Sequence, residues 1–197
     1  MSLELVNTLA TLGTFLVIAA TAIAAIVQLR HARSSNQIVA LNELRESLET
    51  TRFSESLRFI SSQLSIELED PRFRYQIANF GARTAESETS INKIVTIGNF
   101  YETIGLLVKA GFLERDLALD LLAQNASLVW KLLAPIVAVF RRKSPVSYEN
   151  FEFLTVLAED WQAAHPKGTY PEGVRRIELK DRFLEADKQY AASLAPA

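Results

Sequence analysis

The stretch LVNTLATLGTFLVIAATAIAAIVQL, residues 5–29, decides the fold because it contains no charged side chain. A helix of about 20 apolar residues is long enough to cross the ~30 Å hydrocarbon core of a bilayer. We therefore predict a transmembrane helix that begins near Leu5, has Leu16 and Ile18 near its centre and ends near Leu29. The rest of the chain is expected to form one water-soluble helical domain attached to this anchor.

Two other interpretations fit this stretch less well. A cleaved secretory signal begins with positive charge and has a shorter apolar core, whereas the only early charge here is Glu4. A buried helix of a soluble protein suits apolar runs of about 10 to 14 residues. A retained membrane span accounts better for the length of the stretch.

The charges beside the stretch predict its orientation. Arg30, His31 and Arg33 follow it, and only Glu4 precedes it. Positive charges next to a span are retained on the cytoplasmic side of a membrane. We expect a single-pass protein of the cell inner membrane, with its N-terminus outside and its domain in the cytoplasm, so that the lipid bilayer is one of its partners.

Composition limits the classes of function. The chain has 21 Lys and Arg, 23 Asp and Glu and no Cys, and its net charge is −2. It lacks the basic excess that supports non-specific nucleic-acid binding, so no nucleic-acid partner is expected. Thiolate nucleophiles, cysteine zinc sites, phosphate-binding glycine loops and nucleophile elbows are all missing from the sequence. The sequence therefore predicts no catalytic residue, no cofactor and no metal.

Hydrophobic periodicity beyond the anchor predicts an all-α chain. Its four parts are an anchor with a basic flank (1–33), a long juxtamembrane helix (34–70), a helical core domain (71–165) and a loop with an amphipathic C-terminal helix (166–197). The apolar stripe of the juxtamembrane helix weakens between Thr50 and Ser56, which indicates a bend or a break. The last core helix is expected to follow a cap at Ser147, and the C-terminal helix to run from Val174 to Leu194.

Local signals predict where helices begin and end in the first half of the core domain. Asp70 before Pro71 is typical of a capped helix start. Residues 81–89 are small and polar without a period, which predicts a loop, and Ser90 is expected to cap the helix that follows it. Gly111 fits the left-handed position just after the end of that helix.

The next two predicted helices cover residues 114–123 and 127–142. The second is apolar on nearly all sides, which indicates that it is buried. Pro135 is expected to bend it, because an interior proline removes a hydrogen bond and crowds the preceding turn. A second membrane span over residues 121–140 is not favoured, because Lys131 and two side-chain amides would lie within the bilayer.

Glu102 is the polar residue of greatest interest, because it lies within an otherwise apolar helix. A buried carboxylate needs a charged or hydrogen-bonding partner. Arg141 and Arg142, at the end of the apolar helix, are the predicted partners. Trp130 is expected to fill the centre of that helix's packing surface, so its loss should destabilise the domain strongly.

Three motifs in the core domain resemble those of a known family. They are NFYETIGLLVKAGFL (99–113), WKLLAPI (130–136) and YENFEFL (148–154). They are similar to the F-x-E-x-x-G, W-x-x-L-x-P and F-E-x-L pattern of an uncharacterised bacterial family, DUF4760. The resemblance covers about residues 1–165 and implies one N-terminal span followed by a small helical domain, with no known activity.

The sequence leaves two classes of function open. The first is a membrane-anchored helical scaffold or regulatory module that binds another protein or forms a homo-oligomer. The alternative is a membrane-tethered enzyme or small-ligand sensor with a pocket around Glu102 and Trp130. A deep pocket with convergent polar groups would favour the second class, and an exposed apolar groove the first.

Overall fold

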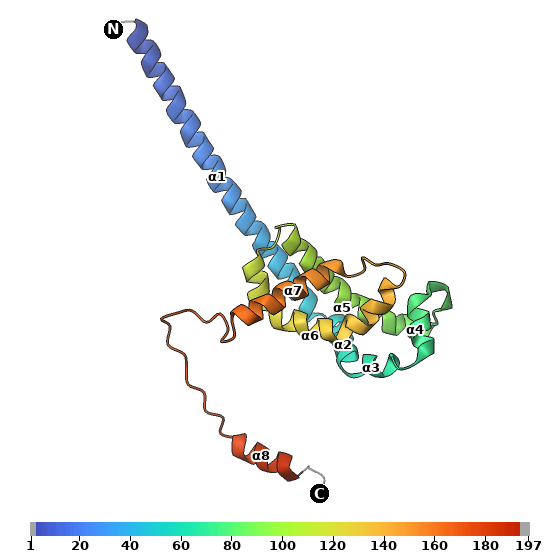
Figure 1. Cartoon of the computed structure of the whole chain (residues 1–197). Helices are drawn as coiled ribbons and strands as arrows, with labels where there is room; N and C mark the ends of the chain where they lie inside the picture. The colour runs from blue at the N-terminus through green and yellow to red at the C-terminus, as the bar shows by residue number, and fades with distance from the viewer. Residues whose placement is uncertain (1–2, 194–197) are drawn as a thin grey trace. The chain divides into compact units, whose positions relative to one another are not determined.

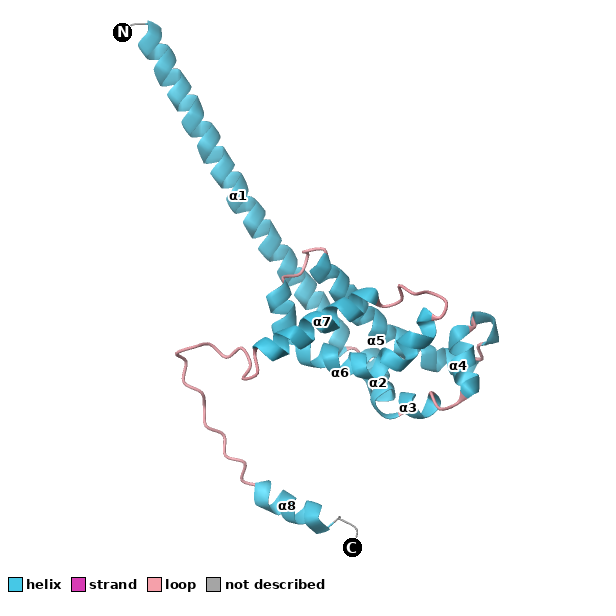
Figure 2. Ribbon diagram, viewed as in Figure 1, coloured by secondary structure: helices cyan, strands magenta, loops and turns pink. Residues whose placement is uncertain are grey.

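The computed structural model describes residues 3–193, with side chains at positions 14, 15, 17, 18, 20–28, 38, 39 and 41–193. Every regular element in this range is a helix, which confirms the all-α prediction (Figure 1, Figure 2). The chain divides into a first unit that ends at Pro166 and a second that begins at Lys167.

The first helix, α1 (Leu3–Glu49), contains the whole uncharged stretch. Its described side chains between positions 14 and 28 are exposed, and they include large apolar groups such as Phe15 and Ile18, which are 67% and 63% exposed. The side chains of Leu5, Leu16 and Leu29 lie outside the described residues. Near the other end of α1, Leu44 is buried and joins the core. Only the last turns of α1 are therefore covered by the protein's own helices, as far as its side chains are described.

The chain breaks after α1, inside the interval where the sequence predicted a bend or break. The Thr50 side chain accepts a hydrogen bond from the Phe53 amide and caps α2 (Thr51–Ser62). A short helix, α3 (Leu64–Glu67), follows. The juxtamembrane segment, residues 34–70, is therefore helical with a break where one was expected, because a threonine cap restarts the chain as a separate helix with its own buried face.

The start of α4 (Pro71–Ala78) confirms the predicted cap. The Asp70 carboxylate accepts a hydrogen bond from the Arg72 amide, and Pro71 occupies the first turn, where its missing N–H removes no helical hydrogen bond. A short 3-10 helix, η1 (Phe80–Ala82), comes next. Part of the loop predicted for residues 81–89 is therefore helical.

The long helix α5 (Ala85–Lys109) begins five residues before the predicted cap at Ser90. Thr84 and Ser87 form a reciprocal capping box instead, in which each side chain accepts a hydrogen bond from the backbone amide of the other residue. Ser90 is buried inside the helix. The predicted end of the helix is confirmed, because Gly111 has a φ of +74° just beyond it.

The next helix, α6 (Arg115–Arg141), is continuous where the sequence predicted two helices, 114–123 and 127–142. Nothing between them breaks a helix, and Ala126 is fully buried, so the apolar face runs straight through the join. Pro135 lies exposed within α6 without ending it.

α6 is the most apolar of the described helices. Among the residues whose side chains are described, it is the one helix long and apolar enough to cross a bilayer, and 50% of its most apolar window is buried inside the first unit. Its packing against α5 and α7 (Glu149–Ala164) agrees with its interpretation as a core helix.

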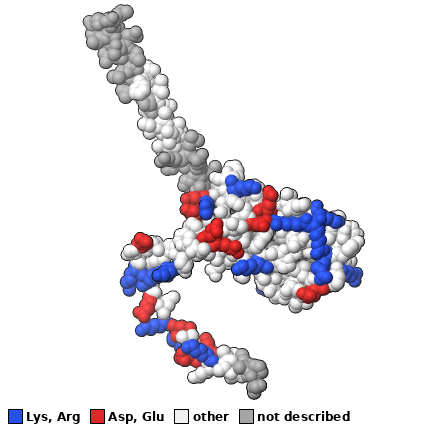
Figure 3. Space-filling view, viewed as in Figure 1, with Lys and Arg blue, Asp and Glu red and all other residues white. Residues whose placement is uncertain are grey.

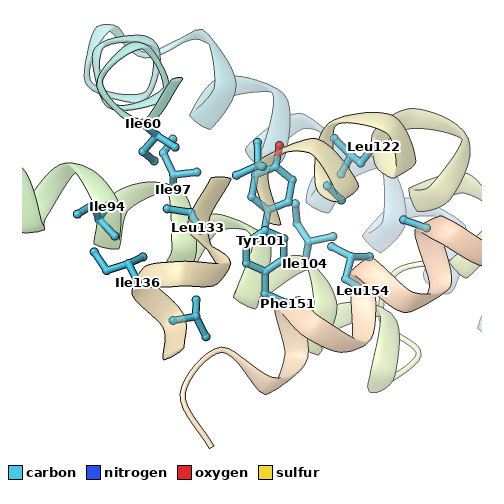
Figure 4. Packing of buried hydrophobic residues seen from close by; sticks show 14 of the residues in the cluster. Ile60, Ile94, Ile97, Tyr101, Ile104, Leu122, Leu133, Ile136, Phe151 and Leu154 are labelled. Atoms are coloured by element: carbon cyan, nitrogen blue, oxygen red, sulfur yellow. The ribbon is translucent and has the colours of Figure 1, made fainter. Parts of the chain in front are cut away.

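The core lies where α5, α6 and α7 meet. Figure 4 shows Ile97, Tyr101 and Ile104 of α5 beside Leu133 and Ile136 of α6 and Phe151 and Leu154 of α7. Each of these side chains is at most 2% exposed. Full burial of an aliphatic or aromatic side chain stabilises a fold by about 1.5–3 kcal/mol, so this layer contributes much of the stability of the unit.

The second unit contains one helix, α8 (Leu184–Ser193), in its described part. The predicted helix from Val174 is wrong over its first ten residues, which are not helical. Asp181 explains the late start, because its carboxylate accepts a hydrogen bond from the Phe183 amide and forms a turn. All side chains of α8 are exposed, so no packing surface stabilises a longer helix.

Candidate functional site

The first and third sequence motifs meet where the start of α7 crosses α5. Gly98 and Gly105 lie one on each side of Glu102 along the same face of α5. A Cβ atom added at Gly105 would lie 2.0 Å from the backbone oxygen of Asn150, and one at Gly98 would lie 2.7 Å from the ring of Tyr148. Gly105 is therefore needed for the start of α7 to approach α5 this closely, whereas a side chain at Gly98 would require the Tyr148 ring to shift.

Glu102 fills the space between these two contacts. Its Oε1 accepts a hydrogen bond of 2.8 Å from Asn150 Nδ2, and its Oε2 accepts one of 2.8 Å from the Phe151 amide. Amides in the first turn of a helix have no acceptor within the helix. The Glu102 carboxylate, which belongs to another helix, thus caps α7. Its negative charge also interacts favourably with the positive end of the α7 dipole.

α7 lacks a cap of its own. Its N-cap residue, Tyr148, has a φ of +57° and makes no side-chain capping bond. The predicted cap at Ser147 is therefore wrong. The left-handed conformation of a non-glycine residue is unusual, and at this point it lets the tyrosine ring lie over Gly98.

The predicted pairing of Glu102 with Arg141 or Arg142 is also wrong. Arg141 Nε donates to the Ser147 carbonyl at 2.9 Å, and its Nη2 donates to Glu152 Oε2 at 2.7 Å. Arg142 is exposed, and no ion pair is found for it among the described residues. Arg141 therefore holds the segment before α7 from the α6 side, while Glu102 holds the first turn of α7 from the α5 side.

Phe151 links the three helices through its ring. The Tyr101 ring stacks on it with a centroid distance of 4.8 Å and an interplanar angle of 13°. Trp130 of α6 approaches it edge-on at 5.0 Å. Trp130 is only half-buried, so it lies at the margin of the core and not at its centre as predicted. We call the contact of Gly98, Tyr101, Glu102 and Gly105 with Tyr148, Asn150 and Phe151 the α5–α7 junction.

The three sequence motifs lie within the match to one protein-family profile. The profile described as a domain of unknown function, DUF4760, matches residues 15–161. The chain belongs to the DUF4760 family. No curated protein and no solved structure matches the chain. The DUF4760 match includes the whole α5–α7 junction and ends before the second unit, so the junction is part of the family domain and residues 167–197 are not.

The junction of this DUF4760 domain joins helices. Both carboxylate oxygens of Glu102 accept hydrogen bonds from α7. Two cavities, of about 420 and 480 Å³, lie elsewhere, one beside α4 and the start of α5 and one between α1, α2 and α5. Neither is lined by Glu102 or Trp130. In the described part of the chain, no group of three His, Cys, Asp or Glu residues is placed to hold a metal ion.

We predict that Glu102→Ala lowers the free energy of unfolding by about 2 kcal/mol, because a buried amide left without an acceptor costs about 1–3 kcal/mol. Denaturant unfolding followed by circular dichroism measures the loss. Glu159→Ala, at an exposed position inside α7, is the matched control and should change stability little. A double-mutant cycle with Asn150→Ala should show coupling, whereas Arg142→Met should be additive within ~0.5 kcal/mol. Coupling to Arg142 alone would contradict the observed cap.

The junction also predicts a response to alkaline pH. Burial raises the pKa of the Tyr101 phenol to about 12, and burial together with the nearby Glu102 carboxylate raises the pKa of Tyr148 to about 12. An unfolded tyrosine titrates near pH ~10. The neutral phenols therefore stabilise the fold fully below that pH, and this contribution is lost as pH rises through the folded pKa.

We expect the free energy of unfolding to fall between pH ~10 and ~12. In Tyr101→Phe the fall should be smaller, because one raised phenol is missing. Measuring stability against pH for both chains tests this, and identical curves would show that Tyr101 does not contribute.

Proposed function

We propose that this DUF4760 protein is a single-pass membrane protein whose helical domain acts by holding a protein partner or a second copy of itself. The N-terminus lies outside the cell, α1 crosses the inner membrane, and the first unit lies in the cytoplasm. In this proposal the chain is a scaffold or a regulatory module and has no catalytic role.

The exposed apolar surface of α1 carries the proposal. Large apolar side chains at positions 15, 17, 18, 23 and 26 are each more than half exposed. An uncovered apolar surface on a helix of this length needs lipid or protein to cover it. The uncharged sequence from residue 5 to 29 has the length of a bilayer crossing, which favours lipid. The charges of Arg30 and Arg33 favour a cytoplasmic domain.

The geometry of the first unit supports a binding role more than an enzymatic one. The alternative function needed a pocket around Glu102 and Trp130, and the Glu102 carboxylate is used to cap α7. Arg141 and Glu102 hold the start of α7 from two sides, and we expect this to make the surface of the unit rigid. A rigid surface loses less conformational entropy when a partner binds.

Membrane integration is tested by washing isolated membranes with alkaline carbonate. The full chain should stay in the membrane pellet and be released only by detergent. A chain without residues 5–29 should be found in the soluble fraction. Release of the full chain by carbonate alone would show that it is not integrated, and the proposal would then fail. Crosslinking within the retained fraction separates a second copy from another partner, because a homodimer has twice the mass of the chain.

A further inference from the structure

Basic and aromatic side chains gather where the end of α4 meets the end of α6. Figure 3 shows Lys and Arg side chains collected at the end of the first unit where Figure 1 places α4. Phe80 and Tyr75 are 75% and 62% exposed. Lys143, just beyond α6, donates a 2.9 Å hydrogen bond to Asn79 Oδ1 at the end of α4 and so joins the two helix ends. We call Tyr75, Phe80, Arg83, Arg142 and Lys143 the α4 patch.

The cations of the α4 patch are not neutralised by carboxylates. The ion pairs of the described residues involve Arg45, Lys109, Arg141 and Lys188, and none involves Arg83, Arg142 or Lys143. Arg83 donates to the backbone oxygen of Gln76 and lies over the Phe80 ring, 4.8 Å from its centroid. Lys143 is held by a neutral amide oxygen. Two of the three cations are therefore fixed in place while their charge remains available.

Two features stabilise this gathering of like charge. Arg142 and Lys143 follow the C-terminus of α6, where the negative end of the helix dipole favours cations. The Arg83 guanidinium gains from the face of the Phe80 ring. Exposed aromatic rings beside arginines are also the residue types that carry most of the binding energy in protein interfaces.

We propose that the α4 patch binds a short acidic segment of a partner protein. This inference deepens the proposed function, because it rests on a membrane-anchored binding module and names the chemistry of the partner. Carboxylates of the segment would pair with Arg83, Arg142 and Lys143, and an apolar residue would cover Phe80. Charge complementarity of this kind raises association rates and selects the partner.

Two other anionic partners fit the surroundings less well. A nucleic-acid backbone would extend past the patch toward the cavity beside α4, which Glu67, Asp70 and Glu86 line, on a chain whose net charge is −2. In Figure 1, α4 lies at the far end of the first unit from the point where α1 joins it, which separates α4 from the proposed span. A short acidic peptide avoids both difficulties.

The test measures binding of a fluorescein-labelled, glutamate-rich peptide that contains phenylalanine to the full chain in nanodiscs of neutral lipid. Fluorescence anisotropy should report binding that weakens with added salt. The triple variant Arg83→Gln, Arg142→Gln, Lys143→Gln should bind the peptide at least roughly tenfold more weakly. This loss is expected when several partners of charge pairs are removed. Phe80→Ala should also weaken binding, with little change in its salt dependence.

A matched variant separates the patch from overall charge. Arg52→Gln, Arg58→Gln, Lys131→Gln removes three exposed cations from other surfaces and should leave affinity within about twofold of the starting chain, because distant surface charges are screened by salt. Unfolding curves of both triple variants check that they remain folded.

An equal loss of peptide affinity in the two triple variants, or no peptide binding by the unsubstituted chain, would overturn the proposal. It would also be overturned if a single-stranded RNA oligonucleotide or vesicles of anionic lipid bound the patch more tightly than the peptide. The carbonate extraction is independent of all these outcomes. If the chain stays in the membrane but the α4 patch does not bind the peptide, the acidic partner is refuted and the anchored module is not. If the patch binds the peptide but carbonate releases the chain, only the membrane anchor is refuted.

Discussion

Replacing Leu16 and Ile18 together with arginine is expected to move the chain from the membrane pellet to the soluble or aggregated fraction. An arginine near the centre of a span costs about 2.5–3.5 kcal/mol on insertion scales, so two such residues cost roughly 5–7 kcal/mol. Ile18 is 63% exposed on α1, so an arginine at this position would not be buried against the protein's other helices and would contact lipid. Fractionation with carbonate and quantification of both fractions measure the effect.

The control for this prediction lies on the same helix. Ile38 and Val39 are 58% and 53% exposed on α1 but follow the basic flank, outside the proposed span. Arginines at these two positions should leave membrane retention unchanged. Equal retention of both double variants would mean that residues 16 and 18 do not lie in lipid.

Gly105→Ala is expected to destabilise the first unit by about 2–3 kcal/mol net, within the range observed for overpacked sites. The added Cβ would lie 2.0 Å from the Asn150 backbone oxygen, so α7 would have to move away from α5. That movement lengthens the hydrogen bonds from Asn150 and Phe151 to Glu102. Alanine is better than glycine in a helix by about 1 kcal/mol, so a net loss reports the steric clash against this gain.

Gly81→Ala provides the comparison for the glycine prediction. A Cβ at Gly81 meets no atom within 4 Å, and its φ is not in the left-handed region. This change should be neutral or slightly stabilising in the same denaturant experiment. If Gly105→Ala were as well tolerated as Gly81→Ala, the close approach of α7 to α5 would be wrong.

Local sequence signals predicted the boundaries that depend on one or two residues. Asp70 with Pro71 marks the start of α4, and Gly111 marks the end of α5, because a cap, a missing amide and a positive φ are properties of the residues themselves. The break at Thr50 was predicted by the weakening of the apolar stripe and not by a cap residue. The all-α class followed from periodicity, which needs no tertiary information.

Tertiary contacts decided the features that the sequence did not predict. The N-terminus of α7 is capped by a residue 49 positions earlier in the chain, which no local pattern reveals. The spacing of Gly98, Glu102 and Gly105 in the sequence indicates close packing against another element, but it does not identify that element. Arg141 was assigned to the wrong carboxylate because Glu152 becomes its neighbour only once α7 has docked.

The missing tertiary contacts also explain why the helix predicted for the tail was too long. Its amphipathic pattern predicted a helix from Val174, yet only Leu184–Ser193 is helical in the described residues. A helix of this kind is stabilised mainly by burial of its apolar face, and every side chain of α8 is exposed. Periodicity alone overestimated the helix because it cannot tell whether a packing surface exists.

The side of the membrane on which the first unit lies is the most direct test of the proposed cytoplasmic domain. A protease is added to sealed vesicles of native membrane in two orientations, right-side-out and inside-out, and the fragments are detected with antibodies to the domain. Residues 34–197 are expected to be protected in right-side-out vesicles and digested in inside-out vesicles. Digestion of the domain in right-side-out vesicles, with protection in inside-out ones, would contradict a cytoplasmic domain.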